Sequence, residues 1–512
     1  MKKYVLILIA EWLILGVSIS CRKPLDLTPV SSVTDGNFWK TADHFDSFAA
    51  GVHTQFRSNN AAFQTLGEMR ADIFAIDPGT KGTFTGEATE GAERLWTQNL
   101  TLDNPGVSNF GGFYNNINQL NLLISKLNGA DIVTAANKNY YLGMAYGMRA
   151  FYYYHLYRSW GSVIIQTEPT SGSTLSISNL AKAASPEADV LALIKTDIDK
   201  SAASFGSDYS FRNLKSYWSK SATLMLKADV YLWTAHRGGG AAEATVAKAA
   251  LDDIRTNVSA LRLLPKYGDV FAGAKGNNEI IFASRYQLNE ETMSFVKSFV
   301  PQNGLISNFY DSLTNRRFSP TTDNWGGVLR SPVRIAAFRA FNDRDSRKLA
   351  SIQPAYQKLS DGTFKIAGCF TNKYQGEQNA GARLFTNDFP VYRYADLLLM
   401  LAEAKAVLGE SPAAELNQIR ARAFGVNYNE AAHGFPNQTV DACPIEAILQ
   451  ERFLEFVFEG KRWYDLRRAG DSYVFKYTAL PASRAYALLW PIDRATLTNN
   501  RLLFQTAGYS SF

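Results

Sequence analysis

Three glutamates recur at four-residue spacing near the C-terminus: Glu451, Glu455 and Glu459. On a helix this spacing stacks the carboxylates on one face, where like charges repel each other. Apolar residues recur at helical spacing on several faces of the same stretch, so we predict one helix over 448–468 that is buried nearly all round. Because buried carboxylates persist only when they are paired or hydrogen-bonded, these three need partners.

Two kinds of chemistry suit such a cluster: acid–base catalysis, or an ion-pair lattice that holds helices together. Several cations lie within helical reach, and two more stand on a preceding helical run. Because every carboxylate has a guanidinium with which it could pair, we favour the lattice. The cations are Arg420, Arg422, Arg452, Lys461, Arg462, Arg467 and Arg468.

No other part of the sequence predicts a catalytic residue, a metal site or a cofactor. The five histidines lie far apart, and the motifs of nucleotide-binding loops, zinc proteases and serine hydrolases are missing. A glycosidase needs only two well-placed carboxylates, which the sequence leaves open. The formal charge of +6 is scattered rather than gathered in a basic run, so nucleic-acid binding is not predicted.

Two tryptophans stand in polar, glycine-rich excursions of the chain, whereas the others lie in helical or apolar runs. Trp96 belongs to the excursion at about 77–112, and Trp325 to the one at about 261–388. An exposed indole would be covered well by the C–H face of a sugar ring. We therefore predict both as ligand-binding residues, with Tyr310 as a weaker third; the alternative is that each ring pins its own loop to the scaffold.

Two charged groups elsewhere have more than one interpretation. Arg70 and Asp72, in the stretch GEMRADIF, could orient a ligand or form an internal ion pair, and we favour the ion pair. The charges of 343–347, which include Asp345 and Arg347, read as a solvated or interface cluster. Arg70 and Asp72 remain candidate ligand-binding residues at this point.

The N-terminus has the pattern of an export signal. A basic start is followed by an apolar run to Leu15 and by small residues up to Cys21. The end of this stretch resembles a lipobox, which predicts a signal peptide over 1–20 and a lipidated Cys21; an ordinary signal is the alternative. We expect 21–512 to form a single domain. The other two cysteines, Cys369 and Cys443, form no disulfide framework, and the sequence leaves open whether they pair.

The mature chain is predicted to be mainly α-helical. Consecutive helical patterns suggest tetratricopeptide-like helical hairpins, with long irregular, loop-rich excursions laid over this scaffold and carrying the ligand site. Gly143 and Gly147 remove bulk from one helix face and should allow a neighbouring helix to approach closely. Within 261–388 we expect irregular structure with one short strand at 279–282. The predicted helices are 38–55, 113–127, 137–160, 186–203, 216–235, 241–257, 389–408, 412–423 and 448–468.

The stretch EFVFEGKRWYDLRR (455–468) resembles a signature of the SusD/RagB family. Further short motifs resemble the family in the same order along the chain, among them 22–29, 38–41, 70–72 and 490–493. The resemblance implies four helical hairpins and a nutrient-binding lipoprotein of the outer membrane, at the cell surface. Such a protein would capture oligosaccharides and deliver them to a TonB-dependent, SusC-like transporter without breaking a bond.

Three other functions stay open from the sequence. Some relatives resemble importers of oligopeptides, an envelope glycosidase would use carboxylates for hydrolysis, and a tetratricopeptide assembly scaffold would bind no small ligand. The sequence does not name the glycan or peptide.

Overall fold

The computed structural model describes residues 38–77, 89–107, 110–170, 181–311 and 313–511. The chain divides into two compact units, 1–47 and 48–512. In the described part of the first unit, the rings of Phe38 and Trp39 meet edge to face at 4.9 Å. The predicted signal peptide and Cys21 lie outside the described residues, so their prediction stands as it was made from the sequence.

Most of the described chain is helical, as predicted. The longer helices are α2 (Ala42–Ser58), α5 (Phe110–Asn128), α6 (Ala135–Trp160), α7 (Glu187–Phe205), α8 (Lys220–Thr234), α9 (Gly240–Asn257), α14 (Tyr394–Val407), α15 (Ala413–Phe424) and α17 (Pro444–Phe456). The shorter ones are α3 (Asn60–Glu68), α4 (Glu93–Trp96), α10 (Asp269–Ala272), α11 (Asn303–Ile306), α12 (Ile335–Arg339), α13 (Arg347–Ser351), α16 (Glu430–His433), α18 (Arg462–Ala469), α19 (Asp471–Tyr477) and α20 (Arg494–Asn499). Short 3₁₀ or π turns are η3 (Asn213–Lys215), η4 (Ala235–Gly239), η5 (Ser294–Phe299), η6 (Gly425–Asn427) and η7 (Ala482–Leu488).

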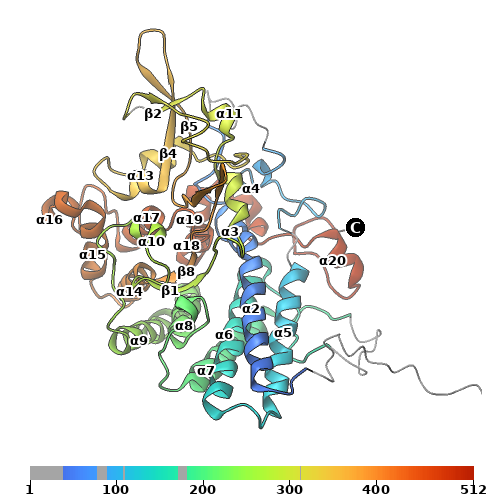
Figure 1. Cartoon of the computed structure of the whole chain (residues 1–512). Helices are drawn as coiled ribbons and strands as arrows, with labels where there is room; N and C mark the ends of the chain where they lie inside the picture. The colour runs from blue at the N-terminus through green and yellow to red at the C-terminus, as the bar shows by residue number, and fades with distance from the viewer. Residues whose placement is uncertain (1–37, 78–88, 108–109, 171–180, 312, 512) are drawn as a thin grey trace, which may run out of the picture. The chain divides into compact units, whose positions relative to one another are not determined.

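Helices that follow one another along the chain pack side by side in the second unit (Figure 1). α5 contacts α6, α6 contacts α7, and the series continues through α8, α9, α14 and α15. At the α6–α7 contact, a Cβ added to Gly143 would come within 2.7 Å of the Phe205 ring. A Cβ added to Gly147 would meet Ser201 Oγ at 2.9 Å. The predicted helical hairpins and the close approach at the two glycines are confirmed.

Three small antiparallel sheets lie among the described residues. The strands are β1 (Ile280–Ser284), β2 (Tyr310–Asp311), β3 (Arg316–Arg317), β4 (Ile352–Lys358), β5 (Phe364–Thr371), β6 (Glu377–Asn379), β7 (Ala382–Leu384) and β8 (Phe389–Arg393). Their order is β1-β8, β3-β2-β4-β5 and β6-β7. The predicted short strand is confirmed as β1, whereas the four-stranded sheet was not predicted. The helix expected over 389–408 was wrong at its start, because its first residues pair with β1 and helix begins only at Tyr394.

The predicted helix over 448–468 is broken into α17 and α18. Between them Phe458 and Gly460 adopt positive φ angles of 68° and 69°. The buried carboxylate of Glu68 accepts hydrogen bonds from both of their backbone N–H groups, at 2.7 and 3.2 Å. Gly67 faces this turn so closely that an added Cβ would collide with the Gly460 carbonyl. A partner almost four hundred residues away in sequence therefore ends the helix, which the local periodicity could not reveal.

The two cysteines of the described chain are both free. Cys369 is buried in β5, whereas Cys443 is exposed just before α17. Burial raises the pKa of the Cys369 thiol far above its ordinary value. In the described ranges, no helix combines the length and apolar character needed to span a bilayer.

Candidate functional site

Glu451, Glu455 and Glu459 form a buried ion-pair lattice. Glu455 Oε1 lies 2.6 Å from Arg393 Nη1, and its Oε2 accepts from Arg347 Nη1 at 3.1 Å. Burial alone would raise the pKa of Glu459, but Arg393 and Lys373 hold that pKa below its ordinary value. The predicted lattice is confirmed. The cations that contact the three carboxylates are Arg347, Lys373, Arg393, Arg420 and Arg422.

Two details of the lattice differ from the prediction. Arg347 and Asp345 were expected in a solvated or interface cluster, but both side chains are buried and pair with each other at 2.7 Å. The cations nearest in sequence serve other carboxylates: Arg452 pairs with Asp465, and Arg468 with Glu403. Helical proximity predicted that pairing would occur, but the tertiary contacts decided which groups pair.

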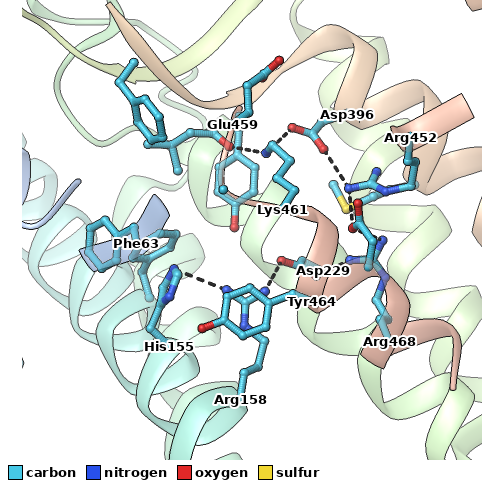
Figure 2. A pocket seen from close by; sticks show the side chains of 17 residues that line it. Phe63, His155, Arg158, Asp229, Asp396, Arg452, Glu459, Lys461, Tyr464 and Arg468 are labelled. Atoms are coloured by element: carbon cyan, nitrogen blue, oxygen red, sulfur yellow. Dashed lines mark hydrogen bonds and ion pairs between the residues drawn. The ribbon is translucent and has the colours of Figure 1, made fainter. Parts of the chain in front are cut away.

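Next to the lattice lies a small chamber among α6, α8, α14, α17 and α18 (Figure 2). Lys461 Nζ lies 2.6 Å from Asp396, and Arg158 lies between Asp229 at 3.3 Å and His155 at 3.3 Å. Burial holds the pKa of His155 well below its ordinary value, so the imidazole is neutral at neutral pH. The chamber has a volume of about 60 Å³, whereas ligand pockets typically span ~300–1,000 Å³. It is too small for a sugar ring.

Neither predicted tryptophan is exposed. Trp96 ends the short helix α4 with 6% of its surface accessible, and Trp325 has 7%. The ring of Trp325 packs edge-on against Phe370 at 5.2 Å, and the guanidinium of Arg383 covers it at 4.3 Å. The expectation of exposed indoles was therefore wrong, because both rings are buried and the ring of Trp325 packs against its neighbours. Contact of either with a ligand stays an untested prediction.

Tyr310 lies apart from the two tryptophan loops, on strand β2. It is half-buried, pairs with Tyr356 across the sheet, and its ring is 5.8 Å from that of Phe364. The five predicted residues are thus distributed over several elements and do not form one pocket.

Arg70 and Asp72 both have structural partners. Asp72 receives two hydrogen bonds of 2.9 Å from Arg462, which confirms an internal ion pair, although with a different arginine. The buried guanidinium of Arg70 lies between the rings of Trp463 at 4.2 Å and Trp490 at 4.9 Å. Burial lowers its pKa to about 10.

The hydrogen bonds of Arg70 tie together two distant segments. Its Nε donates to Gln98 Oε1 at 2.8 Å in the excursion that follows α3. Its Nη1 and Nη2 donate to the carbonyls of Leu489 and Ala487 in the C-terminal segment. Arg70 therefore joins the first excursion to the segment that leads into α20.

A surface hollow has a volume of about 660 Å³ and is lined by both charged and apolar residues. Its walls come from two parts of the excursion, between 89 and 95 and between 102 and 106, and from the start of α20. The backbone N–H of Arg494 donates to the Leu102 carbonyl at 3.3 Å, which joins the two walls. Arg330 reaches the hollow from the second excursion.

Three arginines supply most of the hydrogen-bond donors of this hollow. Arg94 Nη1 donates to Asn104 Oδ1 at 2.8 Å, and Arg330 lies 2.6 Å from Glu90. Arg494 forms two hydrogen bonds with Asp103, at 2.5 and 3.0 Å, and these hold the pKa of that carboxyl below its ordinary value. The side chains of Glu90 and Asp103 are 66% and 58% exposed, so each pair also faces solvent.

Sequence reasoning found the excursion but missed these side chains. Arg94, Asn104 and Arg330 lie in polar stretches without a motif, and Arg494 follows the WPID stretch at 490–493. The signal that could have pointed to them is the excursion itself, because long loops on a rigid scaffold often carry function. Within the ranges that the structure describes, no group of three or more His, Cys, Asp or Glu side chains could hold a metal ion.

Comparisons with known proteins agree with this architecture. A family model described as "SusD family" matches residues 346–509, and one described as "Starch-binding associating with outer membrane" matches residues 37–232. The solved structure of B. fragilis NanU is 45% identical, covers 94% of this chain and 100% of that one, and has a TM-score of 0.87. A SusD superfamily protein from Bacteroides vulgatus is 38% identical over 92% of this chain and 100% of its own, with a TM-score of 0.84.

A curated relative extends the match along the chain. SusD-like protein P38 from Formosa agariphila is 26% identical over 97% of both chains. The same fold, the matches at both ends of the chain and the ion-paired signature stretch lead to one conclusion. The chain belongs to the SusD/RagB family of outer-membrane-associated, glycan-binding proteins.

Proposed function

We propose that the protein captures oligosaccharides in the hollow between the first excursion and α20. Its volume of about 660 Å³ lies within the usual range of ligand pockets. The observation that carries the proposal is the set of three guanidinium groups around it: Arg94, Arg330 and Arg494. Guanidinium groups and carboxylates are strong hydrogen-bond partners for the vicinal hydroxyls of a sugar.

The arrangement of the hollow favours binding over catalysis. Each carboxylate of the hollow, Glu90 and Asp103, lies beside a cation, Arg330 and Arg494 respectively. A glycosidase needs one carboxyl with a raised pKa as its general acid, and the pKa of Asp103 is lowered instead. Capture followed by transfer to a transporter requires no bond to break.

The experiment is isothermal titration of a glycan panel into the pure protein. The panel holds α-1,4- and β-1,3-linked gluco-oligosaccharides and uronic-acid-containing oligosaccharides, with oligopeptides of similar length beside them. Arg330→Ala and Arg94→Ala should each weaken binding of the selected glycan roughly 10- to 100-fold, as expected for a hydrogen bond to a charged group. Thermal unfolding should change little, because Arg330 lies on a loop, Arg94 lies in the four-residue helix α4, and each makes its side-chain contact at the surface.

The matched control is Arg316→Ala. This arginine also forms an exposed ion pair, with Asp323 at 2.5 and 2.8 Å, but lies outside the hollow. Glycan affinity should not change in this variant. Equal loss of affinity in all three variants, or tight binding of peptides alone, would contradict the proposal. New reducing ends during incubation would indicate hydrolysis and overturn the assignment as a binding protein.

We also propose the location and the partner that family membership suggests. Cys21 would carry lipid and anchor the protein in the outer membrane at the cell surface, and a SusC-like TonB-dependent transporter would receive the glycan. Because several acyl chains give stable anchoring, Cys21→Ala should release the protein from membranes of cells that lack the transporter. Retention of that variant in the membrane fraction would contradict the anchor.

A further inference from the structure

Phe504 is exposed to an unusual degree for an aromatic side chain. Its accessible fraction is 81%, whereas the next most exposed of the described aromatic residues, Tyr486, has 41%. The neighbouring Leu503 is buried at 5%, so the chain directs that side chain inward and Phe504 outward. Leaving a phenyl ring in water forgoes ~1.5–3 kcal/mol of burial, which points to a partner that covers it.

Phe504 borders a second hollow, with a volume of about 450 Å³. Its buried apolar floor consists of Leu497 and Leu503, each 5% exposed. The other lining residues are polar: Thr498, Arg501, Gln505 and Ser511. An apolar floor with a polar rim matches a pyranose ring, which has C–H faces and hydroxyl groups around its edge.

Two polar side chains of this rim differ in whether they are already hydrogen-bonded within the protein. Gln505 is fully engaged, since its Oε1 accepts from the N–H of Ile492 and its Nε2 donates to the Ile492 carbonyl. The guanidinium of Arg501 makes no hydrogen bond or ion pair with any described residue. Gln505 therefore stiffens the wall, and Arg501 offers its donors to a ligand.

Helix α20 connects this second hollow to the first. Arg494 and Ala495 line the first hollow, and Leu497 and Thr498 line the second. Four residues of a helix span ~6 Å, and Thr498 Oγ1 donates to the Arg494 carbonyl at 2.9 Å. The two hollows therefore share helix α20, and neighbouring residues of this helix line both of them.

We infer that the hollow at Phe504 is a second sugar-binding subsite for the same oligosaccharide. Phe504 stacks on the face of one ring, and Arg501 donates hydrogen bonds to its hydroxyls. The inference rests on the proposed capture of oligosaccharides in the first hollow, and it adds a preference for longer chains. A protein surface is a less suitable occupant, because stable protein interfaces bury ~800 Å² on each partner, and this feature is one ring beside a concave hollow.

The test is a length series, from disaccharide to hexasaccharide, of the α-1,4- and β-1,3-linked gluco-oligosaccharides, titrated into the full mature chain. Phe504→Ala should weaken the longest members roughly 5- to 100-fold, by analogy with aromatic stacking on bases. The shortest members should bind the variant and the unchanged protein equally well. Phe504→Tyr, which keeps an aromatic face, should restore the affinity.

Leu502→Ala is the matched control, because Leu502 is exposed at 49% beside Phe504 but does not line the hollow. Its glycan affinity should not change. If Phe504→Ala leaves the affinity for every length unchanged while Arg330→Ala weakens binding as expected, the subsite is refuted and the proposed function stands. If no glycan binds the unchanged protein, both the subsite and the proposed function are refuted. Loss of transporter association without loss of glycan affinity in Phe504→Ala would assign the ring to the partner and overturn the subsite.

Discussion

The buried lattice and the surface hollow are both built from arginine–carboxylate ion pairs, but the pairs have different roles in the two regions. Both pair arginines with carboxylates at 2.5 to 3.0 Å, as Arg393 does with Glu455 and Arg494 with Asp103. In the lattice both side chains are 0% exposed, whereas in the hollow they are 49% and 58% exposed. Burial, rather than residue type, separates a structural ion pair from one that can exchange its partners for a ligand.

The physical reason is the cost of an unpaired charge. In the lattice, removal of one partner leaves a buried ion without water or a counter-ion, which is strongly unfavourable. In the hollow, water replaces a lost partner cheaply, so exposed ion pairs contribute little to stability. The same exposure lets sugar hydroxyls replace that water. The two regions should therefore respond to substitution in opposite ways.

The largest expected effect is in the lattice. Glu455→Gln removes the charge that Arg393, Arg347 and Arg422 share, and it should lower the free energy of unfolding by ~3–5 kcal/mol. Denaturant unfolding measures this, and glycan affinity of the folded fraction should not change. Glu410→Gln is the control, because its exposed pair with Lys248 should contribute almost nothing. Unchanged stability with lost binding would make the lattice a functional site.

Trp96 tests the boundary between the two regions. It ends α4, whose Arg94 and Leu95 line the hollow, but its own indole is buried at 6%. Trp96→Ala should cost ~3–5 kcal/mol of stability through the cavity it leaves, as differential scanning calorimetry would measure. If the melting temperature stays unchanged and only glycan affinity falls, the indole is a stacking platform after all.

Glu68 supplies a pH test next to the lattice. Burial raises its pKa to about 7, in contrast to the lowered pKa of Glu459. The folded state therefore keeps a proton that the unfolded chain releases near its ordinary pKa, so stability should fall as pH rises from about 4.5 to 7. Relative to Glu68→Gln, the fall should amount to roughly 2–3 kcal/mol. Urea unfolding of both proteins across this range measures it, and a constant difference would contradict the shift.

The smallest effect concerns the geometry of one guanidinium in the hollow. Arg494→Lys keeps the charge but loses the two parallel hydrogen bonds to Asp103. Glycan affinity should fall only about 3- to 10-fold, less than for an alanine substitution. Titration of the selected glycan gives the readout, and stability should remain within about 0.5 kcal/mol of the unchanged protein. A loss of affinity as large as that in Arg330→Ala would show that glycan binding needs the planar guanidinium group of Arg494 and not only its charge.

Local patterns in the sequence predicted the scaffold well. The helices near 137–160, 186–203 and 241–257 agree with α6, α7 and α9 within a few residues, because their apolar spacing is strong. Gly143 and Gly147 correctly indicated a close helix contact. The glutamates near 455 correctly indicated ion pairing, since buried carboxylates always need partners.

Contacts between distant segments explain the failures. Nothing near Phe458 indicates that Glu68 will bind its N–H and end the helix there. The sequence of strand β8 fits the start of a helix, and only its pairing with β1 shows that it is a strand. The candidate site depends on such contacts throughout, because Arg94, Arg330 and Arg494 meet only in the folded chain. The tryptophans were misjudged because a polar neighbourhood in sequence does not imply exposure in space.

The most direct test of the central claim is a crystal structure of the mature protein with a hexasaccharide of the glycan that the titration panel selects. We predict density for the sugar in the hollow beside α20, with hydroxyl oxygens within hydrogen-bond distance of Arg94, Arg330 and Arg494 and with one ring over Phe504. The lattice around Glu455 should be unchanged. Sugar density elsewhere, with this hollow filled only by solvent, would contradict the account.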